Sequence, residues 1–191
     1  FSIFLIFNLT FVSSAQAAVT FDDINGDGTG FSVGEDTEPD DLAFNNDGTK
    51  MFVVNSGDED VKEFTLTTGF DLSTATLKSS FDVSGQESTP SGIAFNGDGT
   101  KMFVVGRSGE DVNVYTLSTG FDLLTATFND INGDGSGFDV SGQDEGPRSL
   151  AFNNDGTKMF VVGNDGTDIN VYTLSTGFDL LTATFNDING D

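Results

Sequence analysis

The feature that most constrains the fold of this chain is an internal repeat of about 50 residues. Residues 42–54, which read LAFNNDGTKMFVV, recur almost unchanged at 93–105 and 150–162. Each copy continues with a second block and then with Thr-Gly-Phe-Asp-Leu, and residues 113–134 and 170–191 are identical. A fixed period of this size is typical of repeat architectures, so one repeat is the unit from which the structure is built.

Each repeat is predicted to form four short strands. In the middle copy they cover residues 92–96, 101–106, 112–117 and 125–128. The Asn-Gly-Asp-Gly-Thr segment at 96–100 predicts a tight hairpin between the first two strands, because Gly tolerates the positive φ that such turns require. Both alternating faces of 101–106 are apolar, as expected when sheets stack face to face. No segment has a helical period.

The motif AFNxDGTKMFVV followed by DVxxYTLSTG resembles the β-propeller repeats of the YVTN and WD40-like class found in secreted bacterial proteins. The resemblance spans residues 31–191 and implies that 42–44, 93–95 and 150–152 are inner strands lining a central channel. The chain departs from the better-known repeats in having no Trp-Asp dipeptide and in using Phe where they use Tyr or Trp.

The predicted fold class is therefore all-β, with four-stranded antiparallel sheets as propeller blades. The repeats cover about 31–80, 81–137 and 138–191, which makes three blades and the start of a fourth within a propeller region of 18–191. Propellers close with about 4 to 8 blades, so we expect the ring to be incomplete and the rest of the propeller to lie in missing sequence. Assembly of three-blade chains into a ring is the alternative.

The charge excludes one class of partner. With 31 acidic and 7 basic residues the formal net charge is −24, which repels nucleic acid and anionic membrane surfaces. The chain has no Cys and no His, so thiolate and imidazole chemistry are absent. With 36% hydrophobic and 12% aromatic residues, the acidity does not predict disorder.

The N-terminal residues resemble an export signal. Residues 1–12 are almost all apolar and uncharged, and they lead into Ser-Ser-Ala-Gln-Ala-Ala, which has the small-x-small form of a signal-peptidase site. We interpret 1–17 as a secretory signal peptide clipped at its start, because no basic segment precedes it. The apolar run is shorter than the roughly 20 residues of a membrane-spanning helix. The predicted location is extracellular, periplasmic or at the cell surface, with no membrane insertion of the mature chain.

A repeated Asp-Ile-Asn-Gly-Asp-Gly segment predicts a weak calcium site. Oxygen ligands at positions 1, 3 and 5 with Gly at position 6 can wrap a calcium ion. The candidate ligands are Asp23, Asn25 and Asp27 in one copy and Asp130, Asn132 and Asp134 in the next. The closing acidic ligand of an EF-hand is missing, since position 12 is Gly34 or Ser141. The alternative is a set of Asx turns in an inserted loop.

Most other acidic residues have a structural interpretation. Asp47, Asp98 and Asp155 are expected to form the hairpin turns, and Asp60, Asp111 and Asp168 to cap the third strands. Charged positions that break the repeat are Glu35, Asp36, Glu38, Glu87, Arg107, Asp144, Glu145 and Arg148. Arg107 and Arg148 are the candidate ligand-binding residues, because propeller loops at the rim or channel mouth bind ligands.

No catalytic residue is predicted. The interpretation we favour is a secreted, non-catalytic module that binds an extracellular protein, glycan or surface ligand, with calcium as a structural ion. One alternative is a lactonase-like or carboxylate-using propeller enzyme whose catalytic residues lie in other blades, because fold does not choose function. Another is a structural repeat of an adhesin or envelope protein.

Overall fold

The computed structural model describes residues 29–34, 38–166 and 168–188. The chain divides into a unit of Phe1–Gly30 and a unit of Phe31–Asp191. All elements described below belong to the second unit. The predicted signal peptide, Asp23, Asn25 and Asp27, and also Glu35 and Asp36, lie outside the described residues. In the described part of the chain, no helix is long and apolar enough to cross a membrane.

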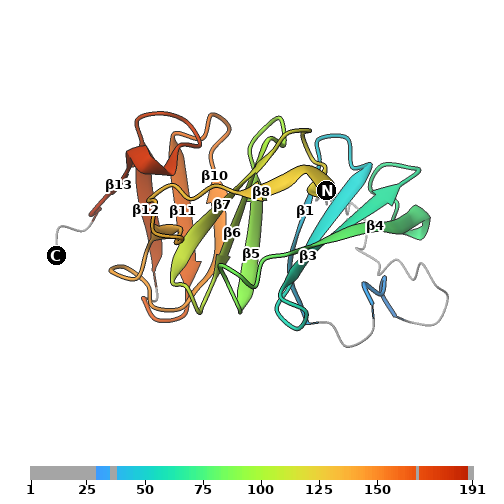
Figure 1. Cartoon of the computed structure of the whole chain (residues 1–191), viewed down its shortest axis with the longest axis horizontal. Coiled ribbons are helices and arrows are strands. Elements are labelled where there is room, and N and C mark those ends of the chain that lie inside the picture. Colours follow the sequence, from blue (N-terminus) through green and yellow to red (C-terminus); the bar gives the residue numbers. More distant parts are fainter. Residues whose placement is uncertain (1–28, 35–37, 167, 189–191) are drawn as a thin grey trace, which may run out of the picture. The chain divides into compact units, whose positions relative to one another are not determined.

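Three antiparallel sheets follow one another in the second unit (Figure 1). In each sheet the first four strands pair in chain order, and the fifth strand of the second sheet, β9, pairs with β7. The first consists of β1 (Pro39–Phe44), β2 (Lys50–Asn55), β3 (Asp60–Leu66) and β4 (Ala75–Asp82). The second consists of β5 (Pro90–Phe95), β6 (Lys101–Gly106), β7 (Asp111–Leu117), β8 (Ala126–Phe128) and β9 (Phe138–Asp139). The third consists of β10 (Pro147–Phe152), β11 (Lys158–Gly163), β12 (Ile169–Leu174) and β13 (Ala183–Phe185). The predicted all-β architecture of propeller blades in an open ring is confirmed.

The outer strand of the second sheet is divided in two. β8 and β9 both pair with β7, with Phe128 opposite Tyr115 and Phe138 opposite Val112. Residues 129–137, which contain the repeated acidic segment, loop out between them. In the first sheet β4 runs without such an insertion and pairs with β3 through a bulge at Glu63 and Phe64. The insertion is therefore accommodated within the outermost strand and leaves the inner three strands unchanged.

A three-residue 3-10 helix forms the corner before each outer strand, where the sequence predicted no helix. These helices are η1 (Leu72–Thr74), η2 (Leu123–Thr125) and η3 (Leu180–Thr182). Each begins with an Asp whose side chain accepts a hydrogen bond from a backbone N–H, namely Asp71, Asp122 and Asp179. A side chain of this type satisfies a backbone donor that the short turn leaves free. The corner is thus held by its own Asp in every repeat.

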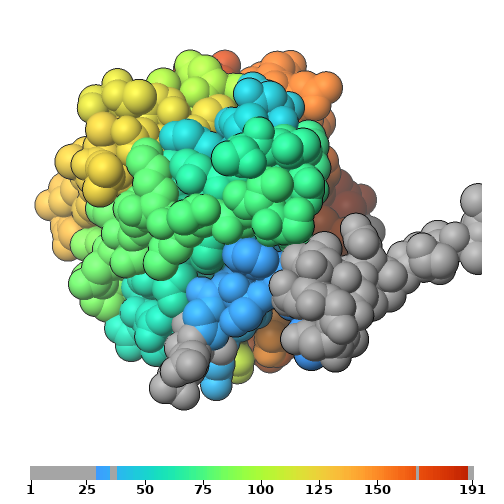
Figure 2. Space-filling view, turned by 90° about the vertical axis from the view of Figure 1, so that its right-hand side faces the viewer, coloured from blue at the N-terminus to red at the C-terminus, as the bar shows by residue number. Residues whose placement is uncertain are grey.

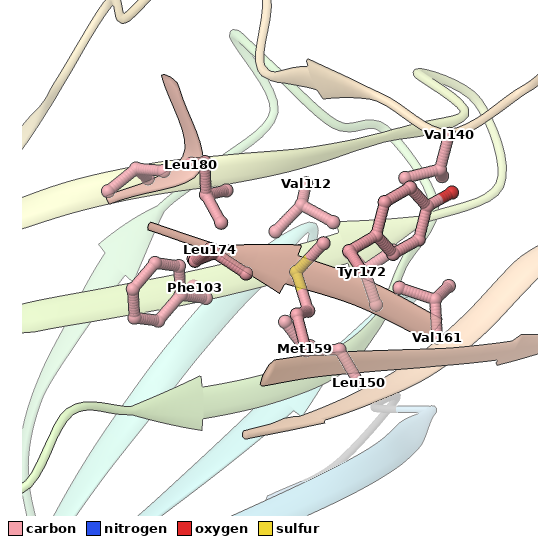
Figure 3. Close-up of a cluster of buried hydrophobic side chains, with 11 residues drawn as sticks. Phe103, Val112, Val140, Leu150, Met159, Val161, Tyr172, Leu174 and Leu180 are labelled. Carbon is pink, nitrogen blue, oxygen red and sulfur yellow. The ribbon is translucent and has the colours of Figure 1, made fainter. Parts of the chain in front are cut away.

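The two faces of each central strand pack into two different cores. Met102 and Val104 of β6 contact the first sheet, and Phe103 and Val105 contact the third. The core between the second and third sheets also contains Tyr172 (Figure 3). Because each sheet is apolar on both faces, it is buried only when a neighbour lies on each side.

Aromatic rings and a lysine join each pair of sheets. Phe103 packs against Phe152 with ring centroids 4.6 Å apart, and Phe152 packs against Phe178 at 5.2 Å. Lys101 donates a hydrogen bond to the backbone oxygen of Phe178 at 2.7 Å. The first and second sheets repeat this arrangement with Phe52, Phe95, Phe121 and Lys50. The repeated Asp-Gly-Thr-Lys sequence therefore links one sheet to the next as well as forming a hairpin.

The first strands of the sheets lie next to one another, whereas their placement along a central channel stays a prediction. β5 contacts both β1 and β10. Asp41 accepts a hydrogen bond from the backbone N–H of Ile93 at 3.2 Å, and the hydroxyl of Ser91 donates to the backbone oxygen of Pro147 at 3.3 Å. These bonds connect β1 to β5 and β5 to β10.

The two end sheets differ in how their outer faces are covered. On the first sheet, Phe31 and Val33 pack against a core that contains Met51 and Phe64, and Figure 2 shows the blue residues at the start of the described chain beside this sheet. On the third sheet, Val162 and Ile169 are 42% and 59% exposed. Their counterparts in the second sheet, Val105 and Val112, are fully buried.

Substitution within one hairpin tests the turn geometry. Gly99 has φ of +72° and a Cβ there would lie 2.2 Å from the ring of Phe121, whereas a Cβ on Gly97 would meet open space. We expect Gly99→Ala to lower the free energy of unfolding by more than about 2 kcal/mol, because left-handed strain and the clash add. Gly97→Ala is the matched control and should stay within about 0.5 kcal/mol. Denaturant unfolding measures both, and equal effects would contradict the assignment.

Candidate binding surface

Antiparallel pairing places two kinds of connection at opposite ends of the sheets. The turn end carries the three Asp-Gly hairpins, at 44–50, 95–101 and 152–158, and the 3-10 helices. The loop end carries the links between second and third strands, at 55–60, 106–111 and 163–168, and the links between sheets. The candidate ligand-binding residues Arg107 and Arg148 both lie at the loop end.

The acidic side chains of the hairpins are bound to their own turns. Asp47, Asp98 and Asp155 each accept two bonds from the Thr two positions on, at 3.0 Å from its backbone N–H and 2.6 Å from its hydroxyl. The Thr hydroxyl is the main cause that holds the pKa of each of these carboxyls below its usual value. This is the structural role that the sequence predicted for them.

The loop end differs from one sheet to the next. Residues 55–59 read NSGDE, 106–110 read GRSGE, and 163–167 read GNDGT. Arg107 is exposed in the second of these loops, and Arg148 is exposed near the start of β10. The position of Arg107 is occupied by Ser56 in the first sheet and by Asn164 in the third. The position of Arg148 is occupied by Asp40 in the first sheet and by Ser91 in the second. The two arginines are therefore displayed singly on an otherwise acidic surface, and the structure does not bring them into a shared pocket.

Glu87 is a buried acid that closes the loop end of the second sheet. Its carboxylate accepts hydrogen bonds from three backbone N–H groups, those of Thr89 at 2.6 Å, Ser108 at 3.1 Å and Gly109 at 2.9 Å. Its side chain is 1% exposed. A buried carboxylate needs such donors to replace its lost hydration. Glu87 therefore ties the loop between sheets to the loop after β6.

The Asp residues at the start of the third strands have different partners in the three sheets. Asp111 accepts hydrogen bonds from Asn113 at 2.6 Å and from the backbone N–H of Gly137 at 2.7 Å. Asp60 is bonded to Asn55, and Asp168 is exposed. Burial is the largest effect on Asp60 and Asp111 and raises the pKa of both carboxyls. Among these three Asp residues, Asp111 is the one whose carboxylate accepts a hydrogen bond from the inserted loop, at the backbone N–H of Gly137.

The acidic segment of the inserted loop folds back on its own backbone. Asp130 accepts from the backbone N–H groups of Gly133 at 2.6 Å and Gly135 at 3.1 Å, and Asp134 accepts from Ser136. Asn132 donates to the backbone oxygen of Gly137 at 2.6 Å. Within the described ranges, no group of three or more acidic side chains is placed to hold a metal ion. The calcium assignment of Asp130, Asn132 and Asp134 stays a prediction, and the bonds observed are those of Asx turns.

Sequence comparison of the repeats missed one unique acid. Glu63 in β3 stands where the other sheets have Val114 and Val171. It is fully buried, with Oε1 2.9 Å from Lys50 and 3.1 Å from Lys78, and its Oε2 accepts from the backbone N–H of Leu123 at 3.0 Å. Its charge at an otherwise apolar position was the available signal. These contacts join Glu63 to neighbouring strands of its own sheet and to the second sheet, so its role is to connect the first two sheets.

Lys78 completes this ionic cluster. It also lies 2.8 Å from Asp122, and this contact is the main cause that raises the pKa of Lys78 and lowers that of Asp122. Buried ion pairs stabilise a fold only when their partners are complete. Here two lysines and a backbone donor surround one carboxylate, so the cluster is neutralised where β4 meets η2.

Solved structures of low sequence identity have a similar fold. A proposed 6-phosphogluconolactonase from Bacteroides fragilis is 19% identical with a TM-score of 0.53, covering 83% of this chain and 40% of that one. A proposed 6-phosphogluconolactonase from Bacteroides uniformis is 16% identical with a TM-score of 0.51, covering 81% and 40%. A protein from Lactobacillus plantarum is 16% identical with a TM-score of 0.56, covering 79% and 41%.

This chain therefore spans about two-fifths of the length of each of these structures. At these identities the likeness concerns the fold alone. The sequence matches no family model and no curated protein.

Carboxyl titration by NMR tests the two environments. We expect Asp98 to titrate below its ordinary pKa and Asp111 above its own, since hydrogen bonding stabilises the charge of the first and burial disfavours that of the second. The ionised Asp98 carboxylate therefore stabilises the fold at pH values above the unfolded-state pKa of about 3.9, and this stabilisation is lost as the pH falls through the folded-state pKa. The contribution of Asp111 is present below about 3.9 and is lost as pH rises through its folded pKa.

Thr100→Val removes the hydroxyl donor and should raise the pKa of Asp98 alone. Thr127→Val is the matched control, because the Thr127 hydroxyl bonds a backbone oxygen and no carboxylate. A pKa of Asp98 that is unchanged by Thr100→Val would contradict the assigned cause.

Proposed function

We propose that this chain is part of an exported, non-catalytic propeller that binds a ligand through its loop end. One observation carries the proposal: the loops of the turn end repeat with the same hydrogen bonds in every sheet, whereas those of the loop end differ in every sheet and hold both arginines. A rigid scaffold that varies its loops at one end is the usual arrangement of a binding surface. The resemblance to secreted YVTN-like repeats and the apolar N-terminal segment support export.

The chemistry of the loop end favours an extracellular protein or glycan as the ligand. An Arg side chain offers a planar fork of donors for carboxylate or carbonyl oxygens and a flat face for stacking on rings. The net charge of −24 disfavours nucleic acid. Three of the buried acids, Glu63, Glu87 and Asp111, are bonded to lysines or backbone donors.

A pair of charge-matched variants tests the binding surface. Arg148 and Lys158 are both exposed cations of the third sheet, the first at the loop end and the second at the turn end. Once a ligand has been found with glycan and extracellular-protein panels, we expect Arg148→Ala to weaken it at least tenfold, because a charge-assisted contact is lost. Lys158→Ala should leave the affinity unchanged. Equal losses would contradict a loop-end site.

Two of the similar solved structures are proposed 6-phosphogluconolactonases, and this favours the lactonase alternative. It is tested on the full-length protein with 6-phosphogluconolactone as substrate. We expect the hydrolysis rate to equal the uncatalysed rate. Catalysed hydrolysis would replace the binding proposal by the enzymatic one.

We also propose that further blades of the same repeat cover the outer face of the third sheet. Leu150, Phe160 and Ile169 line an apolar pocket of about 200 Å³ on this face. Phe160 is the counterpart of Phe103, whose ring is buried against Phe152 of the next sheet. Another repeat would supply a Phe in the same place and a backbone oxygen for Lys158.

Stability measurements test this assembly. In the full-length protein, we expect Phe160→Ala and Phe103→Ala each to cost about 3–5 kcal/mol, because both rings are then buried between sheets. In residues 1–191 alone, Phe160→Ala should cost much less than Phe103→Ala. A small effect of Phe160→Ala in the full-length protein would show that no blade covers this face.

A further inference from the structure

The loop end of the third sheet contains a buried carboxylate oxygen without a partner. Asp144 is 2% exposed, and its Oδ1 accepts a hydrogen bond from the backbone N–H of Gly146 at 2.8 Å. Its Oδ2 is buried and has no hydrogen-bond partner. A buried carboxylate oxygen left in this state is costly unless a ligand completes it.

The second sheet shows how the same position is completed when the side chain is longer. Glu87 occupies the position of Asp144 and reaches the backbone N–H groups of Ser108 and Gly109. The equivalent residues in the third sheet are Asp165 and Gly166, and neither donates a hydrogen bond to Asp144. The loss of one methylene group therefore leaves a gap between the carboxylate and this loop.

Three oxygen atoms lie around the side-chain position that Gly166 leaves empty. A Cβ built on Gly166 would lie 2.6 Å from Oδ1 of Asp168, 3.2 Å from the backbone oxygen of Gln143 and 3.5 Å from Oδ2 of Asp144, so the three oxygen atoms border the same side of this loop. The adjoining pocket has a volume of about 300 Å³ and is lined by Asp144, Glu145 and Asp165, among others. None of the ion pairs in the described part of the chain involves these acidic residues.

We propose that this gap is a divalent-cation site, with Asp144 Oδ2, Asp168 Oδ1 and the Gln143 backbone oxygen as protein ligands. An all-oxygen set that mixes carboxylates with a backbone carbonyl fits calcium better than magnesium, because calcium accepts irregular geometry and completes its shell with water. Two carboxylates place the dissociation constant in the range of about 10⁻⁴–10⁻³ M, as in extracellular modules. The site is separate from the Asp130–Asp134 segment and does not depend on the proposed ligand binding.

Calcium titration of the whole chain tests the site, with thermal unfolding and calorimetric binding as the two readouts. At a calcium concentration ten times the dissociation constant we expect the Tm to rise by about 3–6 °C. Asp144→Glu keeps the net charge and copies the second sheet, so its carboxylate should reach the loop amides. We expect this variant to lose the calcium response and to have a higher Tm than the wild type without calcium.

Two further variants separate the possible origins of a response. Asp168→Asn removes a ligand charge at an exposed position and should weaken calcium binding without affecting folding. Asp134→Ala should leave the response intact, because it alters only the inserted loop. Together these results support the site in the third sheet.

Three outcomes would overturn it. A response that persists in Asp144→Glu and disappears in Asp134→Ala assigns calcium to the inserted loop instead. If magnesium chloride or sodium chloride at the same ionic strength raises the Tm as much as calcium chloride does, the rise reflects screening of the acidic surface. Absence of any response up to 10 times the expected dissociation constant excludes a cation site of this affinity.

Discussion

Face-to-face packing of the sheets is the interaction on which the rest of the structure depends. Each sheet is apolar on both faces, so a single repeat cannot bury its own hydrophobic surface. The Phe103, Phe152 and Phe178 rings and the bond from Lys101 to Phe178 fix how the second sheet meets the third. The loop end is positioned by this packing, because its loops leave strands that are held by the neighbouring sheets.

Much of the fold follows from local sequence. The hairpin at 96–100 and the strand Lys101–Gly106 are as the sequence predicts, since an Asp-Gly turn and an alternating apolar run specify them without tertiary information. The divided outer strand was not predicted. The sequence showed that an insertion was present, but pairing of both β8 and β9 with β7 depends on contacts between distant residues.

The candidate sites were less accessible to sequence reasoning. Comparison of the repeats identified Arg107, Arg148 and Asp144 as unusual, but it could not tell exposed residues from buried ones. The contrast between Glu87 and Asp144 depends on which backbone N–H groups lie within reach, and one methylene group decides it. Glu63 lies within a strand, and its partners Lys50 and Lys78 come together only when β2, β3 and β4 pair, so the sequence did not show what the carboxylate would contact.

The exposed face of the third sheet has a consequence for synthesis. As each repeat leaves the ribosome it can dock on the previous sheet and present the same Phe and Val surface for the next one, so folding can proceed from the N-terminus by stepwise addition. At every stage the apolar face of the last sheet is exposed and can associate with another nascent chain. Chains with a net charge of −24 repel one another, and this repulsion slows such collisions.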